Sequence, residues 1–154
     1  MAYISKINQK KNEWSKIDTD LIAVGIFEEK TLTDLANQID IENDKILTNA
    51  IKTGDLKGKV GEQNLIYVNQ TRVLVVGLGK KKKLNSNTIR KASGLVSRYA
   101  IKQKISSVSI ECFCMDSIQC QAMGEGLVLG SYQFNNYKTD KSKLFELESV
   151  TVLN

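Results

Sequence analysis

The sequence predicts an α/β domain with three layers, α/β/α, around a mixed, mostly parallel sheet. Segments rich in Val, Ile and aromatic residues alternate with segments whose apolar residues recur at helical spacing. One candidate strand, Val73–Val76, is apolar on both faces, as expected of a strand covered by helices on both sides. Residues 69–71 form a link short enough for a hairpin, which predicts that part of the sheet is antiparallel.

Six segments have strand character, which is strong in four of them and weaker in two. The strong candidates are Leu21–Phe27, Leu65–Asn69, Arg72–Leu78 and Ser107–Phe113. The weaker candidates lie near the two ends of the sequence, at Tyr3–Ile7 and Ser149–Leu153.

The first helical pattern has Thr31 as its predicted N-cap and stops at Gly54. Its apolar positions are Leu32, Leu35, Ala36, Ile39, Ile46, Leu47, Ala50 and Ile51. The acidic stretch Asp40–Asp44 interrupts this pattern, so we expect its carboxylates to solvate a break between two helical pieces.

Two further helices are predicted. One has Asn85 as its N-cap and an apolar face made of Ile89, Ala92, Val96 and Tyr99. The other runs from Ser117 to Gln133, with Ala122, Gly126 and Gly130 recurring every four residues. Small residues in a row let a helix backbone come close to a neighbour, so we expect this helix to pack tightly on the sheet or on another helix.

The composition excludes several kinds of catalysis. The 154 residues contain no histidine, which removes Ser-His-Asp and Cys-His catalysis and His-based zinc sites. They contain no proline, which argues against a Pro-rich linker, so a single domain over residues 1–154 is expected. No apolar run approaches the roughly 18 residues of a membrane span, and the first 14 residues lack a signal-peptide pattern. A cytoplasmic protein without membrane association is therefore expected.

Three cysteines cannot all pair within one chain, which favours reduced thiols. Cys112 and Cys114 are two residues apart in an apolar stretch, so we expect both on one face of a strand, while Cys120 begins the next helix. A zinc site would need a fourth ligand, and the sequence has neither a histidine nor a fourth cysteine. Buried or half-buried free thiols are the prediction.

A glycine turn followed by four lysines comes directly after the strand candidate Arg72–Leu78. Glycines before a helix, together with lysines, suit a phosphate group, so Gly77, Gly79, Lys80 and Lys81 are candidate anion or nucleotide contacts. The dinucleotide and P-loop fingerprints are incomplete here. A solvated turn whose glycines meet a backbone requirement is the alternative.

A second basic feature lies on the helix that follows. Arg90, Lys91, Arg98 and Lys102 share one arc and form a candidate basic patch close to the lysine run. The solvated face of an amphipathic helix is the alternative explanation. Four of the five net positive charges come from Lys80 to Lys83, so the rest of the chain is nearly neutral. We identify no catalytic residues and no metal ligands from these patterns.

Five segments, in order, resemble the N-terminal domain of the leucyl aminopeptidase (cytosol aminopeptidase) family. They are DLIAVGIF at 20–27, GDLKGK with GE at 54–62, RVLVVGLGK at 72–80, IRKA at 89–92, and EGLVLGSYQF with YK at 125–138. The resemblance covers nearly the whole chain, and its last segment is the most diagnostic.

The resemblance implies a macro-domain-like fold and a parent enzyme that releases N-terminal amino acids from peptides. It also implies a homohexamer, with two zinc or manganese ions that activate water in a separate C-terminal domain. The family's NTDAEGR signature is absent here. We therefore expect a non-catalytic assembly or regulatory domain, inactive alone, whose partners are its own catalytic domain and sister subunits. On this view residues 1–154 are the first part of a longer aminopeptidase.

Two alternatives remain. Macro-like folds of other families bind ADP-ribose near the loops at strand ends, where the glycine turn is expected, so the chain could be a nucleotide-binding or ADP-ribose-binding module. Some bacterial members of the resembled family also bind DNA, and the basic patch could form an accessory surface for DNA.

Overall fold

The computed structural model describes residues 4–11, 17–132 and 145–154. The described elements follow the order β1 (Ile4–Lys10), β2 (Leu21–Ile26), α1 (Asp34–Glu42), α2 (Ile46–Lys52), β3 (Gln63–Val68), β4 (Thr71–Gly77), η2 (Lys81–Lys83), α3 (Ser86–Lys102), β5 (Ser107–Glu111), α4 (Ser117–Gly130) and β6 (Leu147–Leu153). None of these helices is long and apolar enough to cross a membrane.

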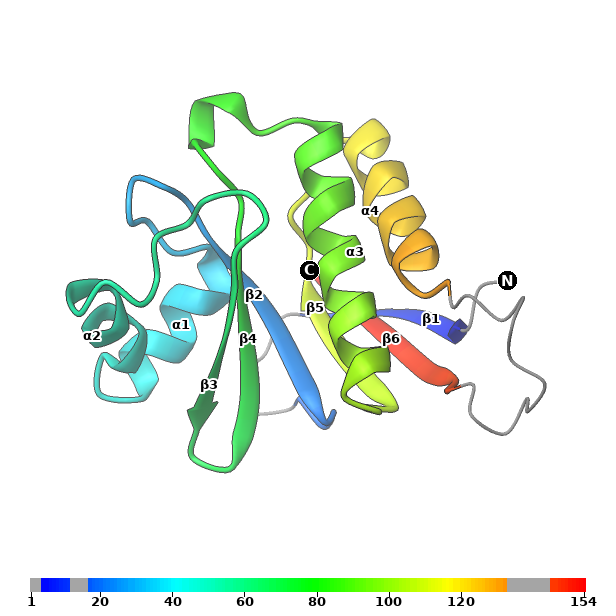
Figure 1. Cartoon of the computed structure of the whole chain (residues 1–154), viewed down its shortest axis with the longest axis horizontal. Helices are drawn as coiled ribbons and strands as arrows, with labels where there is room; N and C mark the ends of the chain where they lie inside the picture. Colours follow the sequence, from blue (N-terminus) through cyan, green and yellow to red (C-terminus); the bar gives the residue numbers. More distant parts are fainter. Residues whose placement is uncertain (1–3, 12–16, 133–144) are drawn as a thin grey trace.

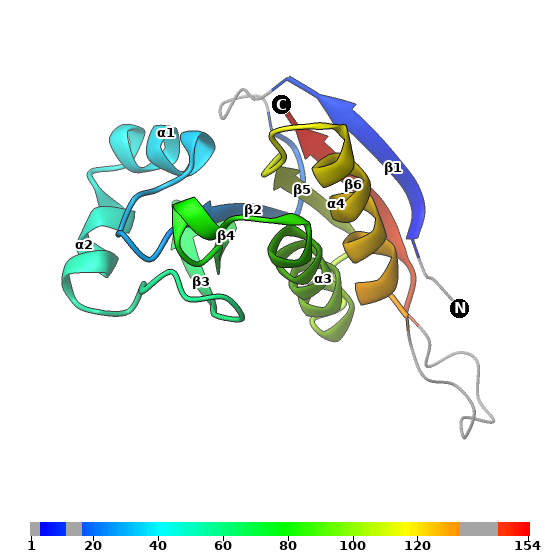
Figure 2. The ribbon, with the colours of Figure 1, turned by 90° about the horizontal axis from the view of Figure 1, so that it is seen from above.

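The six strands form one sheet in the order β1-β6-β5-β2-β4-β3. All neighbouring pairs are parallel except β3 and β4, which form an antiparallel hairpin. The prediction of a mixed, mostly parallel sheet with a hairpin at residues 69–71 is confirmed. Helices α3 and α4 lie side by side on one face of the sheet, and α1 and α2 lie on the other (Figures 1 and 2).

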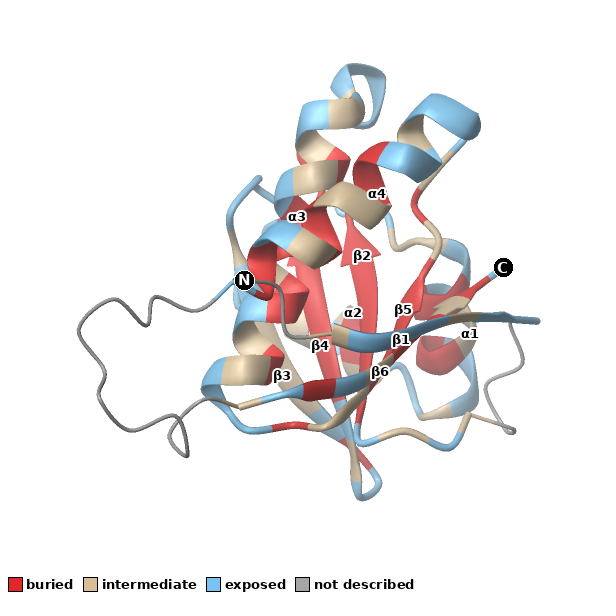
Figure 3. Ribbon diagram, turned by 90° about the vertical axis from the view of Figure 1, so that its right-hand side faces the viewer, coloured by how far each residue is buried: buried red, intermediate tan, exposed pale blue. Residues whose placement is uncertain are grey.

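Two hydrophobic cores lie on opposite faces of the sheet, as a three-layer domain requires. The core beneath α3 and α4 includes Leu74, Ile89 and Leu127, and the core beneath α1 and α2 includes Val75, Ile39 and Leu47. Alternate residues of the central strands supply the two cores, so every residue of β2 is buried. Figure 3 shows the central strands buried and the edge strand β1 largely exposed.

All six predicted strands are present, with shifted ends. The first strand extends to Lys10, three residues further than predicted, and Tyr3 lies outside the described residues. The strand predicted to end at Phe113 ends at Glu111. The last helix ends at Gly130, and the predicted end at Gln133 falls outside the described residues.

The prediction of Thr31 as an N-cap is wrong. Leu32 forms a β-bridge with Ile26, which keeps the chain extended, and α1 starts only after Thr33. The Thr33 hydroxyl makes no cap bond, and its oxygen instead accepts a hydrogen bond from the Gly25 amide at 3.1 Å. By contrast, Asn85 caps α3 as predicted, because its side chain accepts a hydrogen bond from the Thr88 amide at 3.0 Å.

The expectation that the acids at 40–44 are all solvated is wrong for Asp40, which is 1% exposed. Its carboxylate accepts hydrogen bonds from the amides of Leu47 at 2.8 Å and Thr48 at 2.9 Å. These are first-turn amides of α2, which have no partner within their own helix. Asp40 at the end of α1 therefore holds the start of α2, and the break between two helical pieces is real.

The small-residue row of α4 packs against α3 and not against the sheet. A Cβ at Gly130 would lie 2.2 Å from the carbonyl oxygen of Gly94 on α3, closer than real Cβ contacts allow. The two helices therefore approach backbone to backbone, which is the close packing predicted from the sequence.

Candidate functional site

A pocket lies where the parallel strands β2, β4 and β5 end, which is where open α/β sheets usually bind ligands. We call it the carboxyl-edge pocket; its cavity volume is about 470 Å³. Its wall is apolar at Phe27, Leu78 and Phe113, and polar at Glu111 and Lys81. The lining residues come from the segments that begin at the ends of β2, β4 and β5 and from the first turn of α4, which lie far apart in the sequence and which the sheet brings together.

Glu111, the last residue of β5, is the buried acid of this pocket and is 5% exposed. Its carboxylate accepts hydrogen bonds from the Thr33 hydroxyl at 2.5 Å and from the Leu35 amide, in the first turn of α1, at 3.0 Å. Burial raises the pKa of Glu111 to about 7, and the bonds from Thr33 and Leu35 oppose that rise. Glu111 therefore supplies the cap for α1 that Thr33 does not, and it can exchange a proton near neutral pH.

Three cysteine side chains converge beside the pocket, a cluster that the sequence did not reveal. The Sγ atoms of Cys112, Cys114 and Cys120 all lie within 4.8 Å of one another. Cys112 and Cys114 are half-buried as predicted, but they follow β5 and are not part of a strand. Cys120 lies in the first turn of α4 as predicted, and it is exposed, which corrects the expectation of burial.

Cys112 and Cys114 share a hydrogen bond, with 3.2 Å between their sulfur atoms. This bond lowers the pKa of Cys112 to about 6, while it and burial raise the pKa of Cys114. Two cysteines of unequal acidity therefore stand in contact at the pocket.

The glycine turn lies beside the pocket, but its amides already have partners. Gly77 donates its amide to the Glu62 carbonyl at 2.9 Å, and Gly79 donates to the Gly58 carbonyl at 2.8 Å. A Cβ at Gly77 would lie 1.9 Å from the Lys59 carbonyl oxygen, so the close approach of this loop explains that glycine.

The two lysines of the predicted anion site are exposed. The Lys81 amide donates to the Glu29 carboxylate at 3.0 Å, and its ammonium lies 5.8 Å from the Phe27 ring centroid. Any anion bound here would depend on the lysine side chains and not on the amides of Gly77, Gly79 and Lys81.

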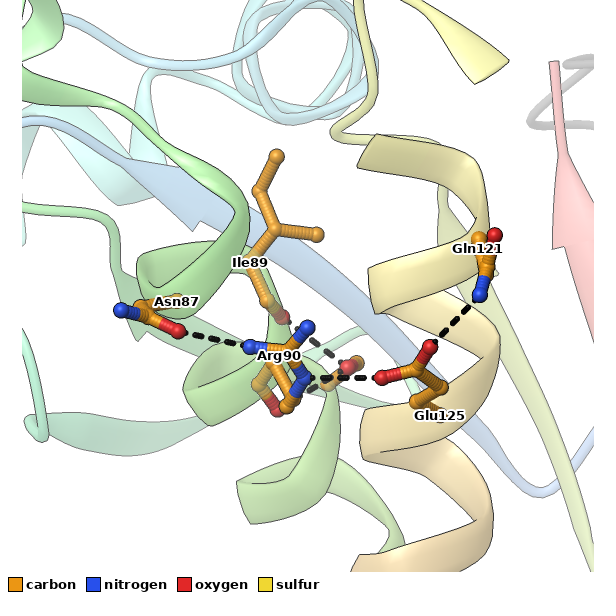
Figure 4. A network of polar contacts seen from close by, with 6 residues as sticks. Asn87, Ile89, Arg90, Gln121 and Glu125 are labelled. Atoms are coloured by element: carbon orange, nitrogen blue, oxygen red, sulfur yellow. Dashed lines mark hydrogen bonds and ion pairs between the residues drawn. The ribbon is translucent and has the colours of Figure 1, made fainter. Parts of the chain in front are cut away.

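The four residues of the predicted basic patch all lie on α3, but they are not equivalent. Arg90 is held by Glu125 of α4, with 3.1 Å between Nε and Oε2, and by the Asn87 side chain at 2.7 Å (Figure 4). Lys91, Arg98 and Lys102 are exposed. The patch therefore presents three exposed basic side chains and one whose charge is partly neutralised.

The donor chemistry of the described residues does not fit the metal pair that the family resemblance implies. Within the described ranges, the one group of three or more acids or cysteines placed to hold an ion consists of Cys112, Cys114 and Cys120. Thiolates are soft ligands, whereas the resemblance implies lysine and carboxylate ligands in a separate domain. The described residues therefore offer no ligand set for that metal pair.

The layered sheet and its carboxyl-edge pocket define an α/β domain of the macro-like class. The chain matches the family model described as "Cytosol aminopeptidase family, N-terminal domain" over residues 23–141. The chain therefore belongs to the cytosol aminopeptidase family, as its N-terminal domain.

Curated relatives carry the same family name. The chain is 33% identical to a probable cytosol aminopeptidase of Alkaliphilus oremlandii over 144 residues, which cover 87% of this chain and 29% of that protein. It is 34% identical to the cytosol aminopeptidase of Dictyostelium discoideum, covering 88% of this chain and 27% of that protein. The chain thus spans less than a third of the length of these relatives.

Solved structures agree on the fold. A tomato leucine aminopeptidase mutant superposes with a TM-score of 0.80 at 21% identity, covering 99% of this chain and 33% of that chain. The macrodomain of Mycobacterium tuberculosis DarG superposes with a TM-score of 0.67 at 13% identity, covering 97% of this chain and 99% of that one. The predicted macro-domain-like fold is confirmed.

Proposed function

We propose that residues 1–154 act as a non-catalytic assembly and regulatory domain of a cytoplasmic, metal-dependent leucyl aminopeptidase. The observation that carries this proposal is the family match over residues 23–141 in a chain that covers only 29% of a relative's length. The parent enzyme would release N-terminal amino acids from peptides with zinc or manganese in its catalytic domain. This domain would contribute surface to the enzyme and no reacting group.

Exposed apolar side chains on and beside α4 support an assembly role. Met115, Ile118, Leu129 and Tyr132 are each at least 51% exposed. Ile118 and Leu129 are eleven residues apart, about three helical turns, so they lie on one stripe of α4. Exposed apolar patches of this kind mark sites of protein–protein contact. We propose that the catalytic domain or a sister subunit covers this one.

The first test is a peptidase assay of this chain with Mn²⁺ and Leu-p-nitroanilide. We expect no turnover above the blank. Clear turnover that persists after repurification would refute the non-catalytic role.

The second test replaces the N-terminal domain of the Alkaliphilus oremlandii relative with this chain. We expect the hybrid to assemble like the parent, and the double substitution Ile118→Asp with Leu129→Asp to impair assembly by light scattering. Ile41 is 58% exposed on α1, across the sheet, so Ile41→Asp is the matched control. Equal assembly of the double variant and the control would argue against the α4 surface.

The carboxyl-edge pocket favours a second candidate function, binding of a nucleotide or ADP-ribose-type ligand. It lies at the strand ends of a macro-like fold and has Lys81 on its wall. Calorimetry with ADP-ribose and with nucleotides tests this candidate. Absence of heat at millimolar ligand would end it, and so would binding that Lys81→Glu leaves unchanged.

DNA binding through the basic patch remains a third candidate, supported by exposed Lys91, Arg98 and Lys102 on one helix. Binding by such a surface weakens as salt rises, because counterions released from DNA drive it. A gel shift insensitive to salt would contradict this candidate.

A further inference from the structure

The cysteine cluster has a geometry suited to one metal ion. An ion held about 2.3 Å from each of three sulfur atoms in a trigonal arrangement places those atoms about 4 Å apart. The Sγ atoms of Cys112, Cys114 and Cys120 lie within 4.8 Å of one another. The sulfur atoms of Cys112 and Cys114 are 3.2 Å apart. Small side-chain rotations therefore bring all three sulfurs to ligand distance.

The backbone around the cluster is fixed by hydrogen bonds. The Cys112 amide donates to the Leu153 carbonyl at 2.9 Å, which ties the loop after β5 to β6. Asp116 caps α4 by accepting from the Gln119 amide at 2.8 Å, and the Gln119 side chain accepts from the Met115 amide at 2.8 Å. The loop and the first turn of α4 thus hold the three cysteines in place before any ion arrives, which favours tight binding.

A fourth sulfur lies next to the cluster. The Sδ atom of Met123, one turn further along α4, lies 3.6 Å from the Cys114 sulfur, and the Met123 side chain is 2% exposed. Thiolates and thioethers are soft ligands that suit Cu(I), zinc and iron–sulfur clusters. Structural zinc sites use four cysteine or histidine ligands, and a thioether is not among them.

We propose that Cys112, Cys114 and Cys120, with Met123 as a fourth donor, bind one Cu(I) ion. Cys112 and Cys114 of this site line the carboxyl-edge pocket, and the site is separate from the aminopeptidase role. Binding exchanges thiol protons for the ion and changes no oxidation state. Solvent reaches the site at Cys120, the exposed member of the cluster, which gives the ion a path of entry.

The test is an anaerobic titration of the reduced chain with Cu(I) in competition with bathocuproine disulfonate. We expect one ion per chain and an X-ray absorption spectrum with only sulfur neighbours. Loss of a residue that only hydrogen-bonds a metal ligand lowers metal affinity about 10–100-fold. Loss of a ligand itself should cost more, so Cys112→Ser and Cys114→Ser should each lower the affinity for Cu(I) by more than about 100-fold.

Met123→Leu keeps the side-chain volume and should weaken Cu(I) binding by about 10-fold, within the range of a lost supporting interaction. Met115 is 83% exposed and outside the cluster, so Met115→Leu is the control and should bind like the parent chain. Circular dichroism checks that each variant is folded.

Three results would overturn the proposal. Binding of Cu(I) with unchanged affinity by the triple serine variant would place the ion elsewhere. Nitrogen or oxygen neighbours in the absorption spectrum would exclude an all-sulfur site, and that measurement needs no variant. Retention of zinc against equimolar Cu(I) would contradict the choice of ion.

Discussion

Gly126 of α4 lies so close to the backbone of α3 that a Cβ on it would be 2.2 Å from the carbonyl oxygen of Arg90. The same atom would be 2.1 Å from the Ser93 hydroxyl oxygen. Because one of these neighbours is backbone, the helices must separate to admit a methyl group. The distance between α3 and α4 is therefore set by the absence of a side chain at this residue.

Gly126→Ala should destabilise the fold. Overpacking typically costs about 1–3 kcal/mol, and the gain in helix propensity returns about 1 kcal/mol. We expect a net loss of up to about 2 kcal/mol in the free energy of unfolding, measured by urea titration with circular dichroism. Gly124 is the matched control, because a Cβ there has no neighbour within 4 Å. Gly124→Ala should be neutral or stabilising, and equal losses at both residues would contradict the packing argument.

Asp40→Ala should loosen the junction between α1 and α2. It removes the acceptor for the Leu47 and Thr48 amides at a residue that is 1% exposed. Hydrogen bonds to charged groups contribute about 1.5–3 kcal/mol, so we expect a loss of about that size in urea unfolding. Glu42→Ala, on the exposed side of the same helix, should change stability by less than about 0.5 kcal/mol. A loss at Asp40 no larger than that would contradict the capping role.

Glu111 should make stability depend on pH. Its pKa is raised from 4.5 to about 7 in the folded chain, so the folded state holds the proton more tightly than the unfolded state. This contribution is fully present below pH 4.5 and is lost as pH rises to about 7. At 1.36 kcal/mol for each pH unit, it amounts to up to roughly 3 kcal/mol.

Glu111→Gln removes that proton exchange. In the metal-free chain, the stability of the parent relative to this variant should fall steadily between pH 4.5 and 7, as followed by urea unfolding at several pH values. Parallel curves for the two proteins would show that Glu111 is not the group responsible.

The Arg90–Glu125 pair should contribute little to stability. Its side chains are 33% and 41% exposed, so water screens their attraction. A double-mutant cycle with Arg90→Gln and Glu125→Gln should give a coupling below about 1 kcal/mol, and added salt should reduce it. A coupling of more than twice that value would mean that the pair is shielded from solvent.

The sequence predicted the sheet, and it predicted that α4 packs closely on the sheet or on another helix, because both depend on local patterns. The apolar run Val73–Val76 predicts a strand buried on both faces, and the spacing of Gly126 and Gly130 predicts close packing of their helix. The ends of elements were harder to place. Leu32 carries helical periodicity but pairs with Ile26 as a bridge, so tertiary pairing overrode the pattern.

The sequence predicted Lys81, on the wall of the pocket, as a candidate contact, but it did not predict the rest of the site, because the contacts there are long-range. Leu35 takes its cap from Glu111, 76 residues away, and no local signal marks that pairing. The spacing of Cys112, Cys114 and Cys120 was visible in the sequence. Their convergence depends on the chain turning back after β5 into α4, which residue spacing alone does not specify.

The place of β1 has a consequence for synthesis on the ribosome. β1 is at the edge of the sheet, and its strand neighbour is β6, the last strand of the described chain. At about 5–20 residues per second, translation from Lys10 to Leu147 takes roughly 7–27 seconds. During that interval β1 has no partner to pair with, although β2 and β4 can already be joined. The nascent chain therefore builds its sheet from the β3 edge toward β5 and β6, and β1, although made before the other five strands, is incorporated last.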